Sequence, residues 1–247
     1  MIIEYVIILS IAHVLGDFYF QTENIATRKE GKFSGVLLHS LEYLGVSLLV
    51  MVPIISFDLI LAAFYLSFVH FMIDAVKYCL LQKKRNIKEG KIFVWDQIAH
   101  IVSIMVLSYI MYNWNFEINH YNVVRDFFAI YGIDKLKLAQ FGLILLILHT
   151  PTNILIQKTL SEYRPKEKNT DIIKNDSKAG RRIGTLERII MLLFISMNQY
   201  AAMGLVLTAK SIARYDRIAK DEKFAEYYLL GTLLSTASVV VCKIVIL

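Results

Sequence analysis

The residues best suited to chemistry are histidine and aspartate pairs that lie within apolar stretches of the chain. Three pairs have the spacing i, i+4, namely His13 with Asp17, His70 with Asp74, and Asp96 with His100. A fourth histidine, His39, lies alone in the apolar stretch FSGVLLHSLEYLG. The spacing places both members of a pair on one face of a helix, where they can contact each other or share a ligand. Because ionisable side chains are costly to place in such apolar segments, they indicate a functional site.

The composition around these pairs is that of an integral membrane protein. Of the 247 residues, 56% are hydrophobic and 19% are charged, and the mean hydropathy is +0.51. An ordinary soluble domain is nearer half apolar, with about a quarter of its residues charged. The net charge of +6 comes largely from basic residues that flank apolar stretches, as anionic lipid headgroups favour. We therefore expect membrane lipid as a partner and no nucleic acid.

Seven apolar stretches must position the pairs. They lie at about 2–20, 33–51, 57–80, 92–113, 137–157, 185–209 and 226–247. A stretch of roughly 20 apolar residues can cross the hydrocarbon core, and a backbone in lipid must satisfy its own hydrogen bonds, so each should be a helix. The predicted fold is an all-α, polytopic integral membrane helix bundle of about seven apolar helices, multi-pass in the cell membrane.

Three regions follow from this pattern. Residues 1–113 form a four-helix membrane core with the His/Asp cluster, residues 114–136 an outer interfacial connection, and residues 137–247 C-terminal membrane helices with a mobile cytoplasmic loop at 158–184. Basic residues in the connections 21–32, 81–91 and 158–184 place these on the cytoplasmic side.

The connection after 185–209 is also basic, although a further crossing would place it outside. Two interpretations are open: the helix at 185–209 turns back within the membrane, for example at Gly204, or 210–225 is an amphipathic helix. The sequence does not decide between them.

The histidines should meet at one level of the core. His13, His39, His70 and His100 each lie several residues from the cytoplasmic end of their helix, which corresponds to depths of roughly 9 to 15 Å. Asp17, Asp74 and Asp96 would lie one helical turn nearer the cytoplasm, with Gln21 and Lys77 extending the same faces toward the mouth.

Four neutral imidazoles and three carboxylates suit a divalent metal, of which zinc is the one this donor set favours. The predicted ligands are His13, Asp17, His39, His70, Asp74, Asp96 and His100. These seven groups exceed one tetrahedral shell, so either one metal with further residues around its ligands or two metals are expected. A bound metal lowers the pKa of a coordinated water and polarises a carbonyl or phosphoryl oxygen. The predicted catalytic groups are Asp17, Asp74 and Asp96, as bases or orienting groups, and Lys77, which would neutralise substrate charge.

A second set of polar residues follows in AGRRIGTLERIIMLL. The planar guanidinium of arginine binds phosphate through two hydrogen bonds, so these arginines suit a headgroup or phosphate clamp. Positive-inside flanking by basic residues would produce the same pattern. The predicted substrate contacts are Gln21, Gln97, Arg181, Arg182, Glu187 and Arg188.

These observations favour a membrane-embedded metal-dependent hydrolase that acts on an amphiphilic or phosphorylated substrate, a small molecule or a lipid, from the cytoplasmic side. Two alternatives use the same residues. The His/Asp cluster could serve an ion- or proton-coupled transporter, or it could be a structural polar network in a non-catalytic membrane scaffold.

Six sequence motifs carry a family resemblance. They are AHVLGDFYFQ, VHFMIDAVK and WDQIAH in the front part, about residues 10–105, and GTLERIIMLL, LTAKSIARY and EYYLLGTLLS in the back part, about residues 180–240. With these motifs the chain resembles a bacterial family of multi-pass membrane proteins catalogued as domain of unknown function 3307. The resemblance implies a membrane-embedded fold and carries no established activity.

Overall fold

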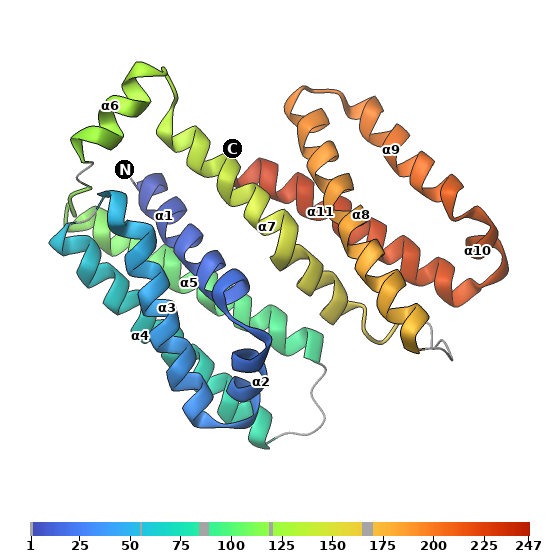
Figure 1. The fold of residues 1–247 in the computed structure, drawn as a ribbon, viewed down its shortest axis with the longest axis horizontal. Helices are drawn as coiled ribbons and strands as arrows, with labels where there is room; N and C mark the ends of the chain where they lie inside the picture. The colour runs from blue at the N-terminus through green and yellow to red at the C-terminus, as the bar shows by residue number, and fades with distance from the viewer. Residues whose placement is uncertain (1, 55, 84–88, 119–120, 165–169) are drawn as a thin grey trace. The chain divides into compact units, whose positions relative to one another are not determined.

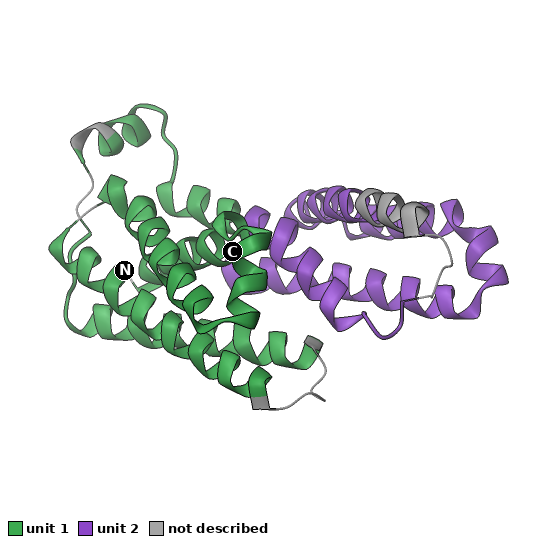
Figure 2. Cartoon of the chain, turned by 60° about the horizontal axis from the view of Figure 1, so that its bottom comes forward, with its two compact units in different colours: residues 1–143 green, residues 144–247 purple. Residues whose placement is uncertain are grey.

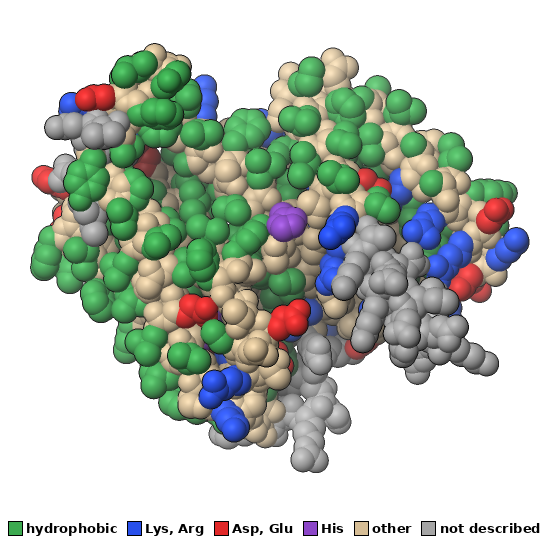
Figure 3. All heavy atoms as spheres, viewed as in Figure 1, with side chains coloured by type: hydrophobic (Ala, Val, Ile, Leu, Met, Phe, Trp, Pro, Cys, Tyr) green, Lys and Arg blue, Asp and Glu red, His purple; other side chains and the backbone are tan. Residues whose placement is uncertain are grey.

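A computed structural model describes residues 2–54, 56–83, 89–118, 121–164 and 170–247, and the chain divides into two compact units, residues 1–143 and 144–247 (Figure 2). The described residues form helices and turns and include no strand, so the all-α prediction is confirmed. Six of the described helical segments are long and apolar enough to cross a membrane. Many large hydrophobic side chains point outward from them, as the green surface in Figure 3 shows.

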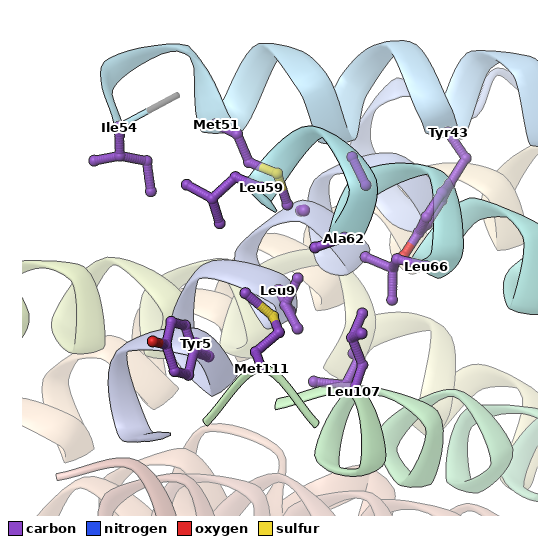
Figure 4. Packing of buried hydrophobic residues seen from close by; sticks show 13 residues of the cluster. Tyr5, Leu9, Tyr43, Met51, Ile54, Leu59, Ala62, Leu66, Leu107 and Met111 are labelled. Carbon is purple, nitrogen blue, oxygen red and sulfur yellow. The ribbon is translucent and has the colours of Figure 1, made fainter. Parts of the chain in front are cut away.

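Four long helices build the first unit. They are α1 (Ile2–Val14), which continues as the π-helix η1 (Leu15–Phe20), α3 (Phe33–Met51), which ends in the 3-10 turn η2 (Val52–Ile54), α4 (Phe57–Lys83) and α5 (Glu89–Asn113). Helix α1 packs against α3, α3 against α4, α4 against α5, and α5 against α1, which closes a ring of four helices (Figure 1). Figure 4 shows Leu9, Leu59, Ala62, Leu107 and Met111 in the apolar core between these helices.

The connection 21–32 contains a helix that the sequence did not predict, α2 (Glu23–Gly31). The Thr22 side chain caps it by accepting a hydrogen bond from the Ile25 N–H at 3.3 Å. Helix α2 packs against α3 and α4. A Cβ atom at Gly35 would lie 2.4 Å from the Arg28 carbonyl, so only glycine permits this close approach of α3 to α2.

The connection 114–136 contains α6 (Asn122–Ile130), a short and strongly amphipathic helix. Phe127 and Ile130 are exposed on it. This character agrees with the interfacial segment predicted there, and its place at the outer face stays a prediction.

The second unit is built by α7 (Lys135–Thr159) from residue 144 onward, α8 (Thr170–Ser196), α9 (Tyr200–Ala213), α10 (Tyr215–Lys220) and α11 (Glu222–Ile246). Helix α8 packs against α9 and α11, and α10 packs against α11. The core of the unit contains Ile144, Leu148, Met191, Leu192, Ile195, Met203, Val239 and Cys242.

Two predictions for this unit need correction. The stretch 158–184, predicted as a mobile loop, is helical from Thr170. Helix α8 begins at this residue, well ahead of its own apolar residues. Propagation of an existing helix adds one hydrogen bond per residue fixed, so a polar stretch without proline can continue it. Residues 165–169 lie outside the described residues.

The apolar stretch 185–209 is not one helix. Helix α8 ends at Ser196, and α9 begins at Tyr200 and runs back along α8 (Figure 1). The chain reverses at Asn198, whose φ of 59° lies in the left-handed region that asparagine tolerates. Of the two interpretations left open, the structure supports the turn, but at Asn198 and not at Gly204, which lies within α9.

Candidate metal centre

The four predicted histidines lie together in the first unit. They come from α1, α3, α4 and α5, and none is more than 4% exposed. The ring centroids of His70 and His100 are 4.3 Å apart, those of His13 and His100 4.9 Å, and those of His39 and His70 5.2 Å. The expected convergence of the imidazoles is therefore present, and metal binding at this place stays a prediction.

Four donor atoms of the cluster lie close to one another. His39 Nε2 lies 3.1 Å from His70 Nε2, 3.2 Å from Asp17 Oδ1 and 3.8 Å from Asp74 Oδ2. His70 Nε2 lies 3.2 Å from Asp74 Oδ2 and 3.9 Å from Asp17 Oδ1. Ligand atoms bound at about 2.05 Å in a tetrahedron are about 3.3 Å apart. Three of the five distances, at 3.1 to 3.2 Å, are close to this value, which suits a tetrahedral ion such as zinc, and the other two are longer.

Asp17 reaches this point through an unusual local backbone. It lies in the π-helix η1, a form that is rare and often occurs at functional sites. The preceding residue, Gly16, lies so close to α3 that a Cβ atom there would be 2.6 Å from the Tyr43 ring. As a result, Asp17 contacts His39 on α3, a neighbour that the predicted pairing with His13 did not include.

Lys29 is a member of the cluster that the sequence analysis missed. Its Nζ lies 2.8 Å from Asp74 Oδ2 and 3.4 Å from Asp17 Oδ1, and the residue is 8% exposed. Burial lowers the pKa of Lys29, but the negative charges of Asp17 and Asp74 outweigh it and hold the pKa above its ordinary value. Lys29 is therefore a charged partner of both carboxylates.

A second group of side chains adjoins these donors. Gln97 Nε2 donates to Asp17 Oδ2 at 3.2 Å and to Asp96 Oδ2 at 3.3 Å, and its Oε1 lies 3.5 Å from His13 Nε2. Lys77, which was predicted to neutralise substrate charge, donates to Asp96 Oδ2 at 2.9 Å. His100 Nε2 lies 3.8 Å from Asp96 Oδ1, and neither atom has a hydrogen-bond partner among the described residues.

Two further residues lie beside the histidines. Glu42 Oε2 lies 3.6 Å from His39 Nδ1, on the side of the ring opposite the donor cluster. Such an outer carboxylate fixes the tautomer of a metal-binding histidine and raises its basicity. The Tyr43 ring stacks on His70 with centroids 3.9 Å apart, and its hydroxyl lies 3.3 Å from His13 Nδ1. Both residues follow His39 in HSLEY, and the i, i+3 position of Glu42 is the signal that could have identified it.

The remaining predicted residues lie elsewhere. Gln21 follows the last residue of η1. Arg181, Glu187 and Arg188 belong to the second unit, where they line a cavity, and Arg182 is exposed on the same helix. The Arg188 guanidinium is largely engaged by neutral acceptors, with its Nε donating to the Leu148 carbonyl at 2.7 Å. Substrate contact by these residues stays a prediction.

The geometry defines an all-helical protein whose apolar helices are long enough to cross a membrane and whose first unit holds a buried histidine, aspartate and lysine cluster. The chain belongs to the family described as Protein of unknown function (DUF3307), whose model matches residues 5–129. That range includes the whole cluster and the three front motifs, and it ends before the three motifs of the back part. No curated protein and no solved structure matches the chain.

Proposed function

We propose that the first unit is a metal-dependent hydrolase centre in a multi-pass protein of the cell membrane. Its substrate is amphiphilic or phosphorylated and is reached from the cytoplasmic side. The observation that carries the proposal is the mutual spacing of four donor atoms, from Asp17, His39, His70 and Asp74, at 3.1 to 3.9 Å for the five distances given above. Mixed imidazole and carboxylate donors at tetrahedral spacing favour zinc over magnesium or calcium, which prefer oxygen ligands and higher coordination numbers.

A catalytic zinc site keeps one position open, whereas four protein ligands close a structural one. Asp17 is the donor best placed to leave a position open. Its Oδ1 is 3.9 Å from His70 Nε2, and its two oxygens are held from outside by Lys29 and Gln97. His39, His70 and Asp74 then form a three-ligand set, and Asp17 acts as general base toward a water in the fourth position.

The side chains of His100, Asp96 and Lys77 supply the second proton transfer, which goes to the leaving group. His100 Nε2 and Asp96 Oδ1 face each other at 3.8 Å with no closer hydrogen-bond partner among the described residues. An imidazole beside a carboxylate can carry a proton to a leaving group, and Lys77 holds the other Asp96 oxygen in place at 2.9 Å. A bound zinc ion contributes Lewis acidity and a more acidic water.

Metal analysis of the purified full-length protein tests the proposal. We expect about one equivalent of zinc in the wild type and its loss in His70→Ala. His149→Ala is the matched control, because His149 is exposed on α7 in the second unit and should leave the zinc content unchanged. Zinc absent from the wild type after loading, or equal zinc in both variants, would refute the metal site.

The reaction class needs its own assay. Zinc-loaded protein in proteoliposomes should release product from a panel of phosphate esters and carboxylic esters, and Asp17→Asn should abolish release while retaining zinc. If the protein binds zinc but hydrolyses no ester, the proposed metal site would stand and the proposed hydrolase activity would be rejected.

A second candidate, ion- or proton-coupled transport, rests on a different observation. Five titratable groups form a continuous chain from Asp17 through His39, His70 and Asp74 to Lys29, with neighbouring atoms 2.8 to 3.2 Å apart. Such a chain can pass protons. Proteoliposomes with a pH-sensitive dye inside test this candidate. If it is correct, the dye should report proton uptake that His39→Ala removes. If the cluster is hydrolytic only, the dye should report no proton uptake.

A further inference from the structure

The second unit contains a cavity of about 380 Å³ whose residues perform no step of the hydrolysis proposed above. Helices α7 to α11 and the turn after α7 supply its walls. Of the described side chains that line it, one is acidic, Glu187, and six are basic, namely Arg164, Arg181, Arg188, Lys210, Arg214 and Arg217. The cavity is therefore strongly cationic, which is unusual for a hollow between apolar helices.

The acidic residue is already engaged. Lys210 donates to Glu187 Oε2 at 2.7 Å, so these two charges cancel. Arg188 is 1% exposed and donates to neutral acceptors, with Nη2 2.7 Å from Asn153 Oδ1 and Nη1 3.2 Å from Ser235 Oγ. Its charge is therefore not balanced by a hydrogen-bonded carboxylate among the described residues, and an anion in the cavity would balance it.

Aromatic residues hold the cations on one side of the cavity. The Arg217 guanidinium lies 4.1 Å from the Phe224 ring centroid, and Lys210 Nζ lies 5.4 Å from that of Tyr228. Gly184 also lines the cavity, and a Cβ atom there would lie 3.4 Å from Arg188 Nη1. The buried Thr232 hydroxyl has no hydrogen-bond partner among the described residues and is available to a ligand.

We infer that this cavity binds the phosphate group of an amphiphilic phosphate ester. Several arginines converge on one hollow, and the guanidinium fork matches a phosphate oxygen pair better than it matches a smaller or monodentate anion. Apolar lining residues such as Ile156 and Ile183 suit the remainder of an amphiphile. The ligand can come from the bilayer, as a phospholipid headgroup, or from solution, as a phosphate ester. This inference does not depend on the metal centre.

The test compares two doubly substituted variants of the full-length protein in detergent. Arg181→Gln/Arg214→Gln removes two cavity arginines, and Lys220→Gln/Lys223→Gln removes two exposed cations of the same unit that do not line the cavity. The lipid arm measures binding of phosphatidylglycerol against phosphatidylcholine by native mass spectrometry. The solution arm measures binding of inorganic phosphate and glycerol phosphate by calorimetry.

We expect the cavity variant to bind at least about tenfold more weakly than the wild type, because each lost charge-assisted hydrogen bond is worth about one factor of ten or more. The control variant should bind like the wild type. A response in the lipid arm identifies a headgroup, and a response in the solution arm alone identifies a soluble ester. Binding in neither arm, or an equal loss in both variants, would overturn the inference.

A single substitution protects the test against misfolding. Arg214→Lys keeps the charge and removes the planar fork, so it should weaken phosphate binding while the melting temperature stays near that of the wild type. Zinc content, which reports the first unit, should not change in any of these variants. Loss of phosphate binding with zinc retained would therefore separate this site from the metal centre.

Discussion

Replacement of Lys29 by methionine isolates the role of the buried lysine, because methionine keeps a long apolar side chain and removes the charge. Without metal, Asp17 and Asp74 would then lie together without the cation that contacts both, at 3.4 and 2.8 Å. Removal of one partner from a buried ion pair costs about 3–5 kcal/mol. The side chains of these aspartates are at most 7% exposed, so solvent screens little of the repulsion. We expect a loss of about 4 kcal/mol, which corresponds to a fall of roughly 8–16 °C in Tm for a chain of this size.

When zinc is present, Lys29→Met should favour the metal site, because the zinc ion takes the place of the lost charge. A divalent ion among the same donors supplies the positive charge that Lys29 provided, and a unit charge about 4 Å away is worth about 4 kcal/mol at the effective dielectric of partly buried sites. Removal of the lysine should therefore tighten zinc binding by at least about tenfold. Saturating zinc should restore most of the lost Tm, since a ligand that binds only the folded state stabilises it.

Differential scanning fluorimetry of EDTA-treated and zinc-titrated protein measures both effects, with Lys32→Met as the control because Lys32 is exposed one residue beyond α2. A group whose folded pKa is raised, as that of Lys29 is, contributes fully below its unfolded value of about 10.4 and loses its contribution only at higher pH. The difference between wild type and Lys29→Met should therefore persist across neutral pH. If the two variants melt alike in EDTA, or if Lys29→Met weakens zinc binding, the reasoning fails.

Three further substitutions test the elements around the two sites. Gly35→Ala should displace α2, because its Cβ would lie 2.4 Å from the Arg28 carbonyl, and it should therefore expose Lys29 to chemical acetylation that mass spectrometry detects. Arg188→Met should lower the free energy of unfolding by about 1–3 kcal/mol, because it removes the buried hydrogen bonds that the guanidinium donates to the Leu148 carbonyl, Ser235 Oγ and Asn153 Oδ1, while the zinc content stays constant; a lower zinc content would contradict this. Asn198→Ala should cost about 1–2 kcal/mol in chemical denaturation because of its left-handed φ of 59°, whereas Asn198→Gly should be nearly neutral.

The sequence was sufficient to predict the six long apolar helices and the faces on which the histidines lie. The length and hydropathy of a segment determine whether it forms a long apolar helix, and the 3.6-residue period determines the face on which a histidine lies. Both are properties of single segments. The convergence of the four imidazoles followed from counting residues along antiparallel helices. These predictions needed no knowledge of which helix contacts which.

Contacts that depend on backbone detail were not predictable in this way. Asp17 was paired with His13 by a rule that assumes a regular α-helix, but the chain at Asp17 is a π-helix, and the carboxylate contacts His39. Lys29 lies in the basic stretch RKEGK and resembles any flanking lysine. Its burial arises because α2 folds back onto α3 at Gly35, which is a tertiary effect.

Charge balance links the residues that the sequence revealed with those that it did not. The carboxylates in and next to the cluster are Asp17, Glu42, Asp74 and Asp96, and the cations that contact them in ion pairs are Lys29 and Lys77. With neutral imidazoles, these groups sum to a charge of about −2 in a region where unbalanced charge is expensive. One divalent cation would balance this sum, as would two protons on the histidines. Among the described side chains that line the cavity of the second unit, six are cationic and one is acidic. Each unit therefore places its excess charge where a ligand of opposite sign can compensate it, a cation in the first unit and an anion in the second.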